Sequence, residues 1–323
     1  MKNMWKDGVM GVVIGDALGC PVQFKSRAEV AKHPITGMRG NGTFNLPAGS
    51  WTDDSSLTLA LLDSIKRLNT IDLHDIMDNF VKWLDNGAFT PFGQAFDIGR
   101  GTMWAIKKYK IDKRPEKCGG TEDWNNGNGS LMRIMPACLF CVDKQLNDDD
   151  AIKVIHQVAS LTHAHIRSNI ACGLYYFMVK AILENDGALL DRLQTGLNHG
   201  FSFYKNFLAN QANVGCYDRL KDLAIFANTP QNAIKSSGYV VDTLEAAVWS
   251  LINTNSFDSA LLMAVNLGDD SDTVAAIAGG LAGLFYGYDA IPKNWLQAIQ
   301  KRDMIDTLCC VSFTKARWSC RDT

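Results

Sequence analysis

The chain has 323 residues, of which 47% are hydrophobic and 20% are charged, and its formal net charge is −2. This near-neutral balance argues against a nucleic-acid-binding protein, which usually carries a basic surface. No stretch approaches the roughly 20 apolar residues needed to cross a bilayer, and the N-terminus lacks signal-peptide features, so we expect a cytoplasmic protein without membrane contact.

The first predicted element is an N-terminal helix with glycine at every third or fourth position. Gly8, Gly11, Gly15 and Gly19 would form one nearly bare stripe on it. Glycine costs about 1 kcal/mol relative to alanine inside a helix, so the stripe needs a reason, and close approach of another backbone is the obvious one. The helix after Asp272 has a similar group of glycines between positions 279 and 283. We therefore expect both helices to be central and tightly packed.

Helical periodicity continues along the chain. Apolar residues recur at steps of three and four, as one face of a helix requires, whereas hairpin and strand signals are missing. The fold class is therefore predicted to be all-α. We expect further helices at about 55–68, 73–84, 97–109, 148–162, 166–185, 242–253, 257–267, 272–286 and 293–300, and loops at 36–51, 86–94, 112–129 and 228–238. Cys138 and Cys141 lie in an apolar run and are interpreted as buried thiols rather than as zinc ligands.

Two acidic clusters precede apolar helices. Helix capping explains either cluster alone, but each has more carboxylates than a cap uses. Asp270 and Asp272 are two residues apart, so they converge only where the backbone turns, and converging carboxylates favour a bound cation. The oxygen-only donor set favours hard ions such as Mg²⁺, Mn²⁺ or Ca²⁺. If both clusters serve one site, residues 54 and 270 must meet, which favours a single domain over residues 1–323. The polar residues are Thr52, Asp53 and Asp54 in the first cluster and Asp270, Asp272 and Thr273 in the second.

Three weaker polar motifs leave alternatives open. The glycine-rich turn at 125–130 leads into an apolar run, so it is either an anion site at a helix N-terminus or a plain surface turn. His163 and His165 are either a ligand pair or residues that end and cap helices. Asp97, in a polar helix entrance, is a cap, a substrate contact or a general base.

Seven motifs in order resemble the ADP-ribosylglycohydrolase family, whose best-known branch removes ADP-ribose from dinitrogenase reductase. They are GVVIGDALGCPVQF, GSWTDDSSLTLAL, AFDIGRGT, GNGSLMRIMP, LTHAH, GYVVDTLEAAVWSL and NLGDDSDTVAAIAGGLAG. The resemblance runs over about residues 7–297. It implies a compact all-α orthogonal bundle with a binuclear Mg²⁺ or Mn²⁺ site.

The resemblance also implies roles for particular residues. The family's metal-ligand positions fall on Thr52, Asp53, Asp54, Asp270, Asp272 and Thr273. Its ADP-ribose contacts fall on Asn128, Gly129 and Ser130 at the diphosphate, on His163, and on Tyr239 at the adenine. Asp97 matches an acid near the leaving group, and Asp53 or Asp54 would take the proton of the attacking water.

Three positions depart from the family pattern. Gln23 stands where the family usually has a glutamate near the metals, and glutamine is unable to take a proton. If that glutamate is the essential base, Asp53 or Asp97 would have to replace it. Asp269 stands where glycine is usual, and His165 departs from the commoner residue after the Thr-His pair.

The predicted function is metal-dependent hydrolysis at C1″ of the distal ribose, most favourably of ADP-ribosyl-arginine on a protein. Serine-linked or small-molecule ADP-ribose conjugates are a second possibility, and a nucleotide or phosphoester hydrolase is a third. A protein that binds ADP-ribose without cleaving it is the alternative outside the enzymes. Gln23 supports this alternative, because glutamine is unable to act as the base that the usual glutamate would provide. The expected partners are an ADP-ribosylated substrate and two divalent ions, with no nucleic acid, and the protein is expected to be a monomer.

Overall fold

The computed structural model describes residues 3–205 and 211–310. Within these residues the regular structure is helical, with three isolated β-bridges and no strand, so the all-α prediction is confirmed. The α-helices are α1 (Met4–Gly19), α2 (Arg27–Val30), α3 (Asp53–Leu68), α4 (Leu73–Asn86), α5 (Arg100–Asp112), α6 (Met135–Asp143), α7 (Asp148–Ser160), α8 (Ile166–Glu184), α9 (Leu189–Lys205), α10 (Gln211–Gly215), α11 (Leu223–Ala227), α12 (Val240–Ile252), α13 (Phe257–Val265), α14 (Ser271–Tyr286), α15 (Lys293–Ala298) and α16 (Arg302–Cys309). Short 3₁₀ helices are η1 (Cys20–Val22), η2 (Gly42–Phe44), η3 (Pro115–Lys117), η4 (Asp123–Asn125), η5 (Leu131–Arg133), η7 (Asp218–Lys221), η8 (Gln231–Ala233) and η9 (Tyr288–Ala290).

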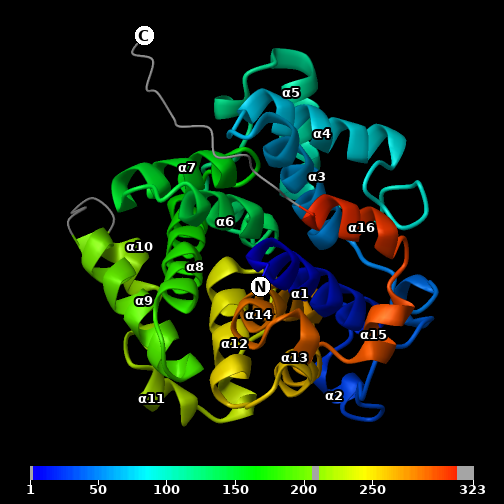
Figure 1. The fold of residues 1–323 in the computed structure, drawn as a ribbon, viewed down its shortest axis with the longest axis vertical. Helices are drawn as coiled ribbons and strands as arrows, with labels where there is room; N and C mark the ends of the chain where they lie inside the picture. Colours follow the sequence, from blue (N-terminus) through cyan, green and yellow to red (C-terminus); the bar gives the residue numbers. More distant parts are fainter. Residues whose placement is uncertain (1–2, 206–210, 311–323) are drawn as a thin grey trace.

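Helices α1 and α14 lie side by side in the middle of the bundle (Figure 1). A Cβ atom added at Gly11 would lie 2.1 Å from the carbonyl oxygen of Gly279, and one added at Gly15 would lie 2.0 Å from that of Ala275. Side chains at these positions are therefore excluded by backbone. The expectation that both glycine-bearing helices are central and tightly packed is confirmed. The structure adds that they pack against each other, which brings Gly19, at the end of α1, against Asp272, at the start of α14.

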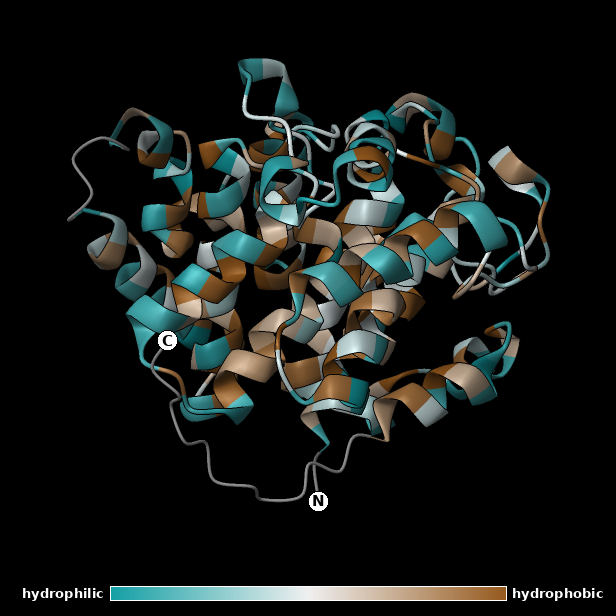
Figure 2. Ribbon diagram, turned by 90° about the horizontal axis from the view of Figure 1, so that it is seen from above, coloured by the Kyte–Doolittle hydropathy of each residue, from teal (hydrophilic) through white to brown (hydrophobic). Residues whose placement is uncertain are grey.

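The other helices surround this pair. Helices α12 and α13 pack on α14, while α3 and α6 pack on α1 (Figure 1). Helices α8 and α9 pair with each other and complete one flank, and α4 and α5 extend from α3 on another. Hydrophobic residues are concentrated on the central helices and hydrophilic residues on the outer ones (Figure 2). One continuous hydrophobic core results, as burial of apolar helix faces requires.

Most predicted helices are present within a few residues of their expected bounds, with two informative differences. Helix α5 begins at Arg100 rather than at 97, because Asp97 has a left-handed φ of 53° and Gly99 occupies the N-cap. Helix α9 was not predicted, since Gly196 and Gly200 interrupt its apolar face. Both glycines lie against α8, where a Cβ at position 196 would lie 2.5 Å from the carbonyl oxygen of Phe177.

Two smaller expectations concern cysteines and membranes. Cys138 and Cys141 lie on α6 with no exposed surface and unpaired thiols, as predicted. Among the described residues, none of the helices combines the length and apolarity that crossing a bilayer requires.

Candidate active site

The two acidic clusters meet at the N-termini of α3 and α14. Thr52 is the N-cap of α3, and its hydroxyl accepts a hydrogen bond from the backbone N–H of Asp54. Asp270 is the N-cap of α14, with a turning backbone at φ −90° and ψ 50° that places it beside Asp272. The hydroxyl of Thr273 donates to Oδ2 of Asp54 over 3.4 Å, linking segments 219 residues apart. The predicted meeting of residues 52–54 with 270–273 is therefore present in the structure.

Several carboxylate oxygens of this cluster are buried without a partner. Both oxygens of Asp272 and Oδ1 of Asp54 are inaccessible and accept no hydrogen bond from the described residues. Burial raises the pKa of Asp272 well above its ordinary value, and the neighbouring Asp270 and Asp54 raise it further. Burial likewise raises the pKa of Asp53, with Asp97 as the next cause. The cluster thus concentrates acidic oxygens where water is excluded, which is costly unless a proton or a cation neutralises them.

Asp16 is a buried aspartate that the sequence analysis did not single out. It projects from α1, and its carboxylate accepts hydrogen bonds from the backbone N–H groups of Thr52 (3.0 Å) and Ser55 (2.9 Å) and from the hydroxyl of Ser55 (2.5 Å). It therefore satisfies donors of the first turn of α3 from outside that helix. Burial raises its pKa to about 6, and these hydrogen bonds oppose the rise. One signal was available in the sequence, namely a lone acid inside the bare glycine stripe.

Gln23 and Asp97 lie beside the first acidic cluster and are hydrogen-bonded to each other. The side-chain amide of Gln23 donates to Oδ2 of Asp97 over 2.7 Å, while its own Oε1 is buried and has no partner among the residues that the structure describes. Burial raises the pKa of Asp97 to about 7, although the hydrogen bond from Gln23 lowers it. Asp97 lies three residues before α5 and is not that helix's cap, which removes one of its predicted alternatives.

The glycine-rich turn lies beside the second cluster. The amide of Asn128 donates to Oδ2 of Asp270 over 2.6 Å and to the hydroxyl of Thr243 over 3.0 Å. The side-chain amide of Asn128 thus donates its hydrogen bonds to protein groups, although this residue was predicted to face a ligand. The turn also pairs with the segment that carries Tyr239, through the isolated bridge between Gly127 and Tyr239. The half-buried Tyr239 lies near Arg167, whose guanidinium is 3.5 Å from the phenol oxygen.

Ser130 and the two histidines complete the set of predicted residues. Ser130 is fully buried, with its hydroxyl 3.6 Å from the thiol of Cys172. The ring of His163 packs against Gly129 of the turn and is buried. His165 is the N-cap of α8 and accepts a hydrogen bond from the backbone of Arg167, so it caps a helix, as one of its alternatives held.

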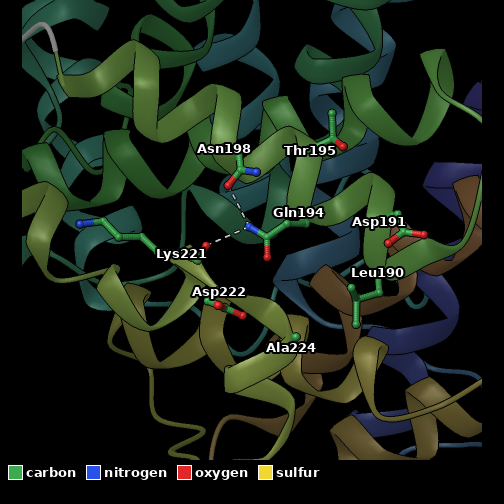
Figure 3. A pocket seen from close by; sticks show the side chains of 8 residues that line it. All are labelled: Leu190, Asp191, Gln194, Thr195, Asn198, Lys221, Asp222 and Ala224. Atoms are coloured by element: carbon green, nitrogen blue, oxygen red, sulfur yellow. Dashed lines mark hydrogen bonds between the residues drawn. The ribbon is translucent and has the colours of Figure 1, made fainter.

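Two surface pockets lie outside this cluster. One, of about 650 Å³, borders the second cluster through Asp269 and is also lined by Arg27 and Lys235. The other, of about 510 Å³, lies between α9 and the segment around Asp222 (Figure 3). In it Gln194 donates to Asn198 and to the backbone of residue 221, so its amide ties α9 to that segment. The second pocket shares no lining residue with the acidic clusters.

Comparisons with known proteins identify the family to which the chain belongs. The sequence matches the ADP-ribosylglycohydrolase family over residues 4–320. The chain belongs to the ADP-ribosylglycohydrolase family. It is therefore a hydrolase of ADP-ribosyl linkages, as predicted, and the match reaches further toward the C-terminus than the expected end near residue 297.

Individual relatives match most of this ADP-ribosylglycohydrolase domain. The ADP-ribosylarginine hydrolase Tri1 of Serratia proteamaculans is 31% identical over 306 residues, which cover 94% of this chain and 77% of that protein. The ADP-ribosyl-[dinitrogen reductase] glycohydrolase of Rhodospirillum rubrum is 29% identical, over 91% of this chain and 89% of that protein. A solved ADP-ribosylglycohydrolase-related protein complex superposes with a TM-score of 0.73 at 27% identity, covering 95% of both chains.

The predicted ligand atoms have the chemistry that a hard divalent cation prefers. All the predicted ligands offer oxygen, and Oδ1 of Asp54 and both oxygens of Asp272 are buried without a partner among the described residues. Within residues 3–205 and 211–310, however, no three histidine, cysteine, aspartate or glutamate side chains are grouped as a preformed metal site. The carboxylates and hydroxyls of the cluster fit a hard cation in their chemistry.

Proposed function

We propose that this chain hydrolyses the bond between ADP-ribose and an arginine side chain of a modified protein, and that two divalent cations, Mg²⁺ or Mn²⁺, take part. The arginine linkage is supported by two relatives at 31% and 30% identity, from Serratia proteamaculans and Pseudomonas putida, which are named ADP-ribosylarginine hydrolases. Asp97 also suits a cationic guanidinium leaving group, since its carboxyl lies beside the cluster.

The observation that supports the cations is the pair of unpartnered oxygens on the fully buried Asp272. An ionised carboxylate without a hydrogen-bond partner in the interior is strongly destabilising, and nearby carboxylates increase the cost. A divalent cation would remove it. We assign the ligands to Thr52, Asp53, Asp54, Asp270, Asp272 and Thr273.

The proposed reaction balances without any oxidant or reductant. Bound cations would supply positive charge that binds ribose hydroxyl oxygens and polarises the attacking water. The water oxygen forms a bond to C1″ as the bond from C1″ to the guanidine nitrogen breaks, and Asp53 or Asp54 accepts the water proton. The departing neutral guanidine takes up one proton, so the arginine product is again a cation. The transition state resembles an oxocarbenium ion, which the surrounding carboxylates stabilise.

Asp97 is assigned the proton exchange at the leaving group. Burial raises the pKa of Asp97 to about 7, so its carboxyl holds a proton more readily than an exposed aspartate does, which suits a group that gives and takes protons. Gln23 donates to the same carboxyl, so it orients Asp97 rather than transferring a proton itself. This arrangement gives Gln23 a role compatible with hydrolysis, although the family usually has glutamate there.

A release assay tests the proposal. Purified protein is incubated with proteins carrying arginine-linked or serine-linked ADP-ribose, each with Mg²⁺, with Mn²⁺ and with EDTA, and free ADP-ribose is measured. We expect release from the arginine conjugate only, dependent on the added cation. Release from the serine conjugate alone would overturn the linkage, and undiminished release in EDTA would overturn the role of the cations.

A further inference from the structure

Arg133 is a buried cation that the proposed chemistry does not use. It follows the glycine-rich turn on η5, and its side chain has no exposed surface. The guanidinium lies over the ring of Phe80, 4.9 Å from its centroid, and none of the salt bridges among the described residues includes it. Its Nε is buried and has no partner within residues 3–205 and 211–310, so this charge is expensive to hold in the interior. Such a cost calls for a role beyond packing.

The guanidinium is connected to His163 through one hydroxyl. Nη2 of Arg133 donates to Oγ1 of Thr162 over 2.7 Å, and this oxygen lies 2.9 Å from Nδ1 of His163. Arginine is a donor only, so the threonine oxygen accepts from it and keeps its own hydrogen free to donate onward. The threonine oxygen has a second lone pair, so the contact alone fits either direction, but among the described residues no other acceptor is within hydrogen-bond distance of this hydroxyl. The hydroxyl keeps its hydrogen bonded only if it donates to Nδ1 of the ring. A ring that accepts at Nδ1 carries its proton at Nε2.

The Nε2 edge of His163 lies against a surface of glycines. Cβ atoms added at Gly101, Gly129 and Gly127 would lie 2.9, 3.1 and 3.5 Å from Nε2. These glycines come from the start of α5 and from the glycine-rich turn, which are far apart in sequence. Side chains at these positions would cover the ring nitrogen. Because these residues are glycines, no side chain at these three positions covers Nε2, and the nitrogen lies beside the turn that resembles the diphosphate cradle.

The ring stays neutral in this environment. Burial lowers the pKa of His163 to about 3, and the charge of Arg133 lowers it further. A neutral ring has one donor and one acceptor, so its tautomer decides whether Nε2 attracts or repels a ligand oxygen.

We propose that Arg133 is a positioning residue that acts through the hydroxyl of Thr162 to hold His163 with its proton on Nε2, where it donates to an oxygen of bound ADP-ribose. The ligand in this statement rests on the proposed function, whereas the tautomer does not. In the opposite tautomer a lone pair would face the ligand oxygen and weaken its binding.

The test combines nitrogen NMR with a binding measurement. Protein labelled with ¹⁵N-histidine is assigned with His163→Gln, and long-range proton–nitrogen spectra report which ring nitrogen is protonated. We expect Nε2–H in the wild type. Thr162→Val removes the relay at nearly constant shape, so we expect a mixture of tautomers and an ADP-ribose affinity about five- to tenfold weaker. Thr162→Ser keeps the hydroxyl and should restore both readouts.

Matched variants separate this role from loss of a buried hydroxyl in general. Thr58→Val also removes a buried hydroxyl, but that hydroxyl has no partner, so tautomer and affinity should stay as in the wild type. Arg133→Met, checked for folding by circular dichroism, should give the same mixture of tautomers as Thr162→Val. If Arg133→Met does not fold, the Thr162 variants still test the relay.

The outcomes distinguish this inference from the proposed function. Nδ1–H in the wild type, or an unchanged tautomer in Thr162→Val, would overturn the relay whatever the enzyme cleaves. The expected tautomers in a protein that does not bind ADP-ribose would instead refute the ligand assignment and leave the relay standing. A change in affinity without any change in tautomer would show that Thr162 contacts the ligand directly, and would also overturn the relay.

Discussion

Asp16 and Asp272 are neighbouring buried aspartates with opposite surroundings. Asp16 accepts hydrogen bonds from two backbone N–H groups and a hydroxyl, which offset much of the cost of its burial. Asp272 accepts no hydrogen bond on either oxygen from the part of the chain that the structure describes. A carboxylate kept in this condition contributes nothing to stability by itself, so its presence is better explained by binding.

Replacing Asp272 by asparagine should separate stability from function. In EDTA at pH 7.5 we expect Asp272→Asn to be more stable than the wild type by about 1 kcal/mol or more, since the neutral amide avoids a buried charge beside Asp270. Its affinity for Mn²⁺ should fall by more than about tenfold, with loss of ADP-ribose release. Thermal unfolding and Mn²⁺ titration measure the two effects.

Asp16→Asn is the control, and it should move stability in the opposite direction. The substitution replaces one carboxylate oxygen with an NH₂ group, although the carboxylate accepts hydrogen bonds from three donors. We therefore expect the free energy of unfolding in EDTA to fall by about 1–3 kcal/mol. If both variants lost stability alike, Asp272 would have a structural role that the hydrogen-bond pattern does not show.

Gln23→Glu tests how Asp97 is tuned. The substitution removes the amide that donates over 2.7 Å and puts a second carboxyl in its place. Both changes disfavour the ionised form of Asp97, so its pKa should rise above about 7. In a pH–rate profile the limb assigned to Asp97 should move to higher pH. Asp97→Asn should remove that limb, and a limb that persists in Asp97→Asn would belong to another group.

Local pattern revealed only part of the site. Repeated acids at helix starts and a two-residue spacing indicated a bound cation, and the two clusters were expected to meet if both serve one site. The hydrogen bond from Asn128 to Asp270 joins residues 142 apart in sequence and has no local signature. Asp16 was missed although it lies inside the glycine stripe, because the sequence does not show which donors its carboxylate meets.

At the scale of elements, glycine spacing was the most informative signal and also the most misleading. It predicted that each of the two glycine-bearing helices packs closely against another backbone, and the structure shows that α1 and α14 are partners in this contact. The same residue type hid α9, where Gly196 and Gly200 lower helix propensity but let the helix approach α8. Glycine in a helix therefore indicates close packing only when its partner is identified.

Alanine substitutions along α1 test this packing. In Gly11→Ala the new Cβ would lie 2.1 Å from a carbonyl oxygen of α14, so backbone has to move, and we expect a loss of about 3 kcal/mol or more in urea unfolding. Gly8→Ala is the matched control on the same helix. Its Cβ would meet only the side chains of Leu284 and Met135 at 3.1 and 3.2 Å, which can shift. We expect its stability to stay within about 1 kcal/mol of the wild type. Equal losses in the two variants would contradict the backbone contact.

For the whole molecule, α1 sets the distance between the two clusters. Asp16 on this helix holds the first turn of α3, and a Cβ added at Gly19, three residues later, would lie 2.3 Å from Cα of Asp272 on α14. One helix thus positions two segments that are more than two hundred residues apart. The sequence predicted that these segments meet, but it contained no indication that α1 lies between them, because that depends on the three-dimensional path of the chain.

The pH dependence of stability should reveal how this assembly of acids is neutralised. Burial raises the pKa of Asp16 to about 6 and that of Asp97 to about 7, both above the ordinary 3.8. A group whose pKa is raised in the folded state contributes stability that is full below its unfolded pKa and is lost as pH rises through the folded value. In EDTA, these carboxyls should therefore lower stability progressively between about pH 4 and pH 7.

Divalent cations favour the ionised carboxylates, so the increase in Tm caused by Mg²⁺ or Mn²⁺ should grow from pH 5 to pH 8. His156 and His163, whose pKa values are lowered by burial, weaken the protein as pH falls below 6.5, but they do so with and without the cation and cancel in the difference. Differential scanning fluorimetry in EDTA and in excess cation at each pH measures that difference. Asp272→Asn should show a smaller increase at every pH. An increase that is the same from pH 5 to pH 8 would mean that the cation binds away from the buried acids, and the proposed site between α3 and α14 would be wrong.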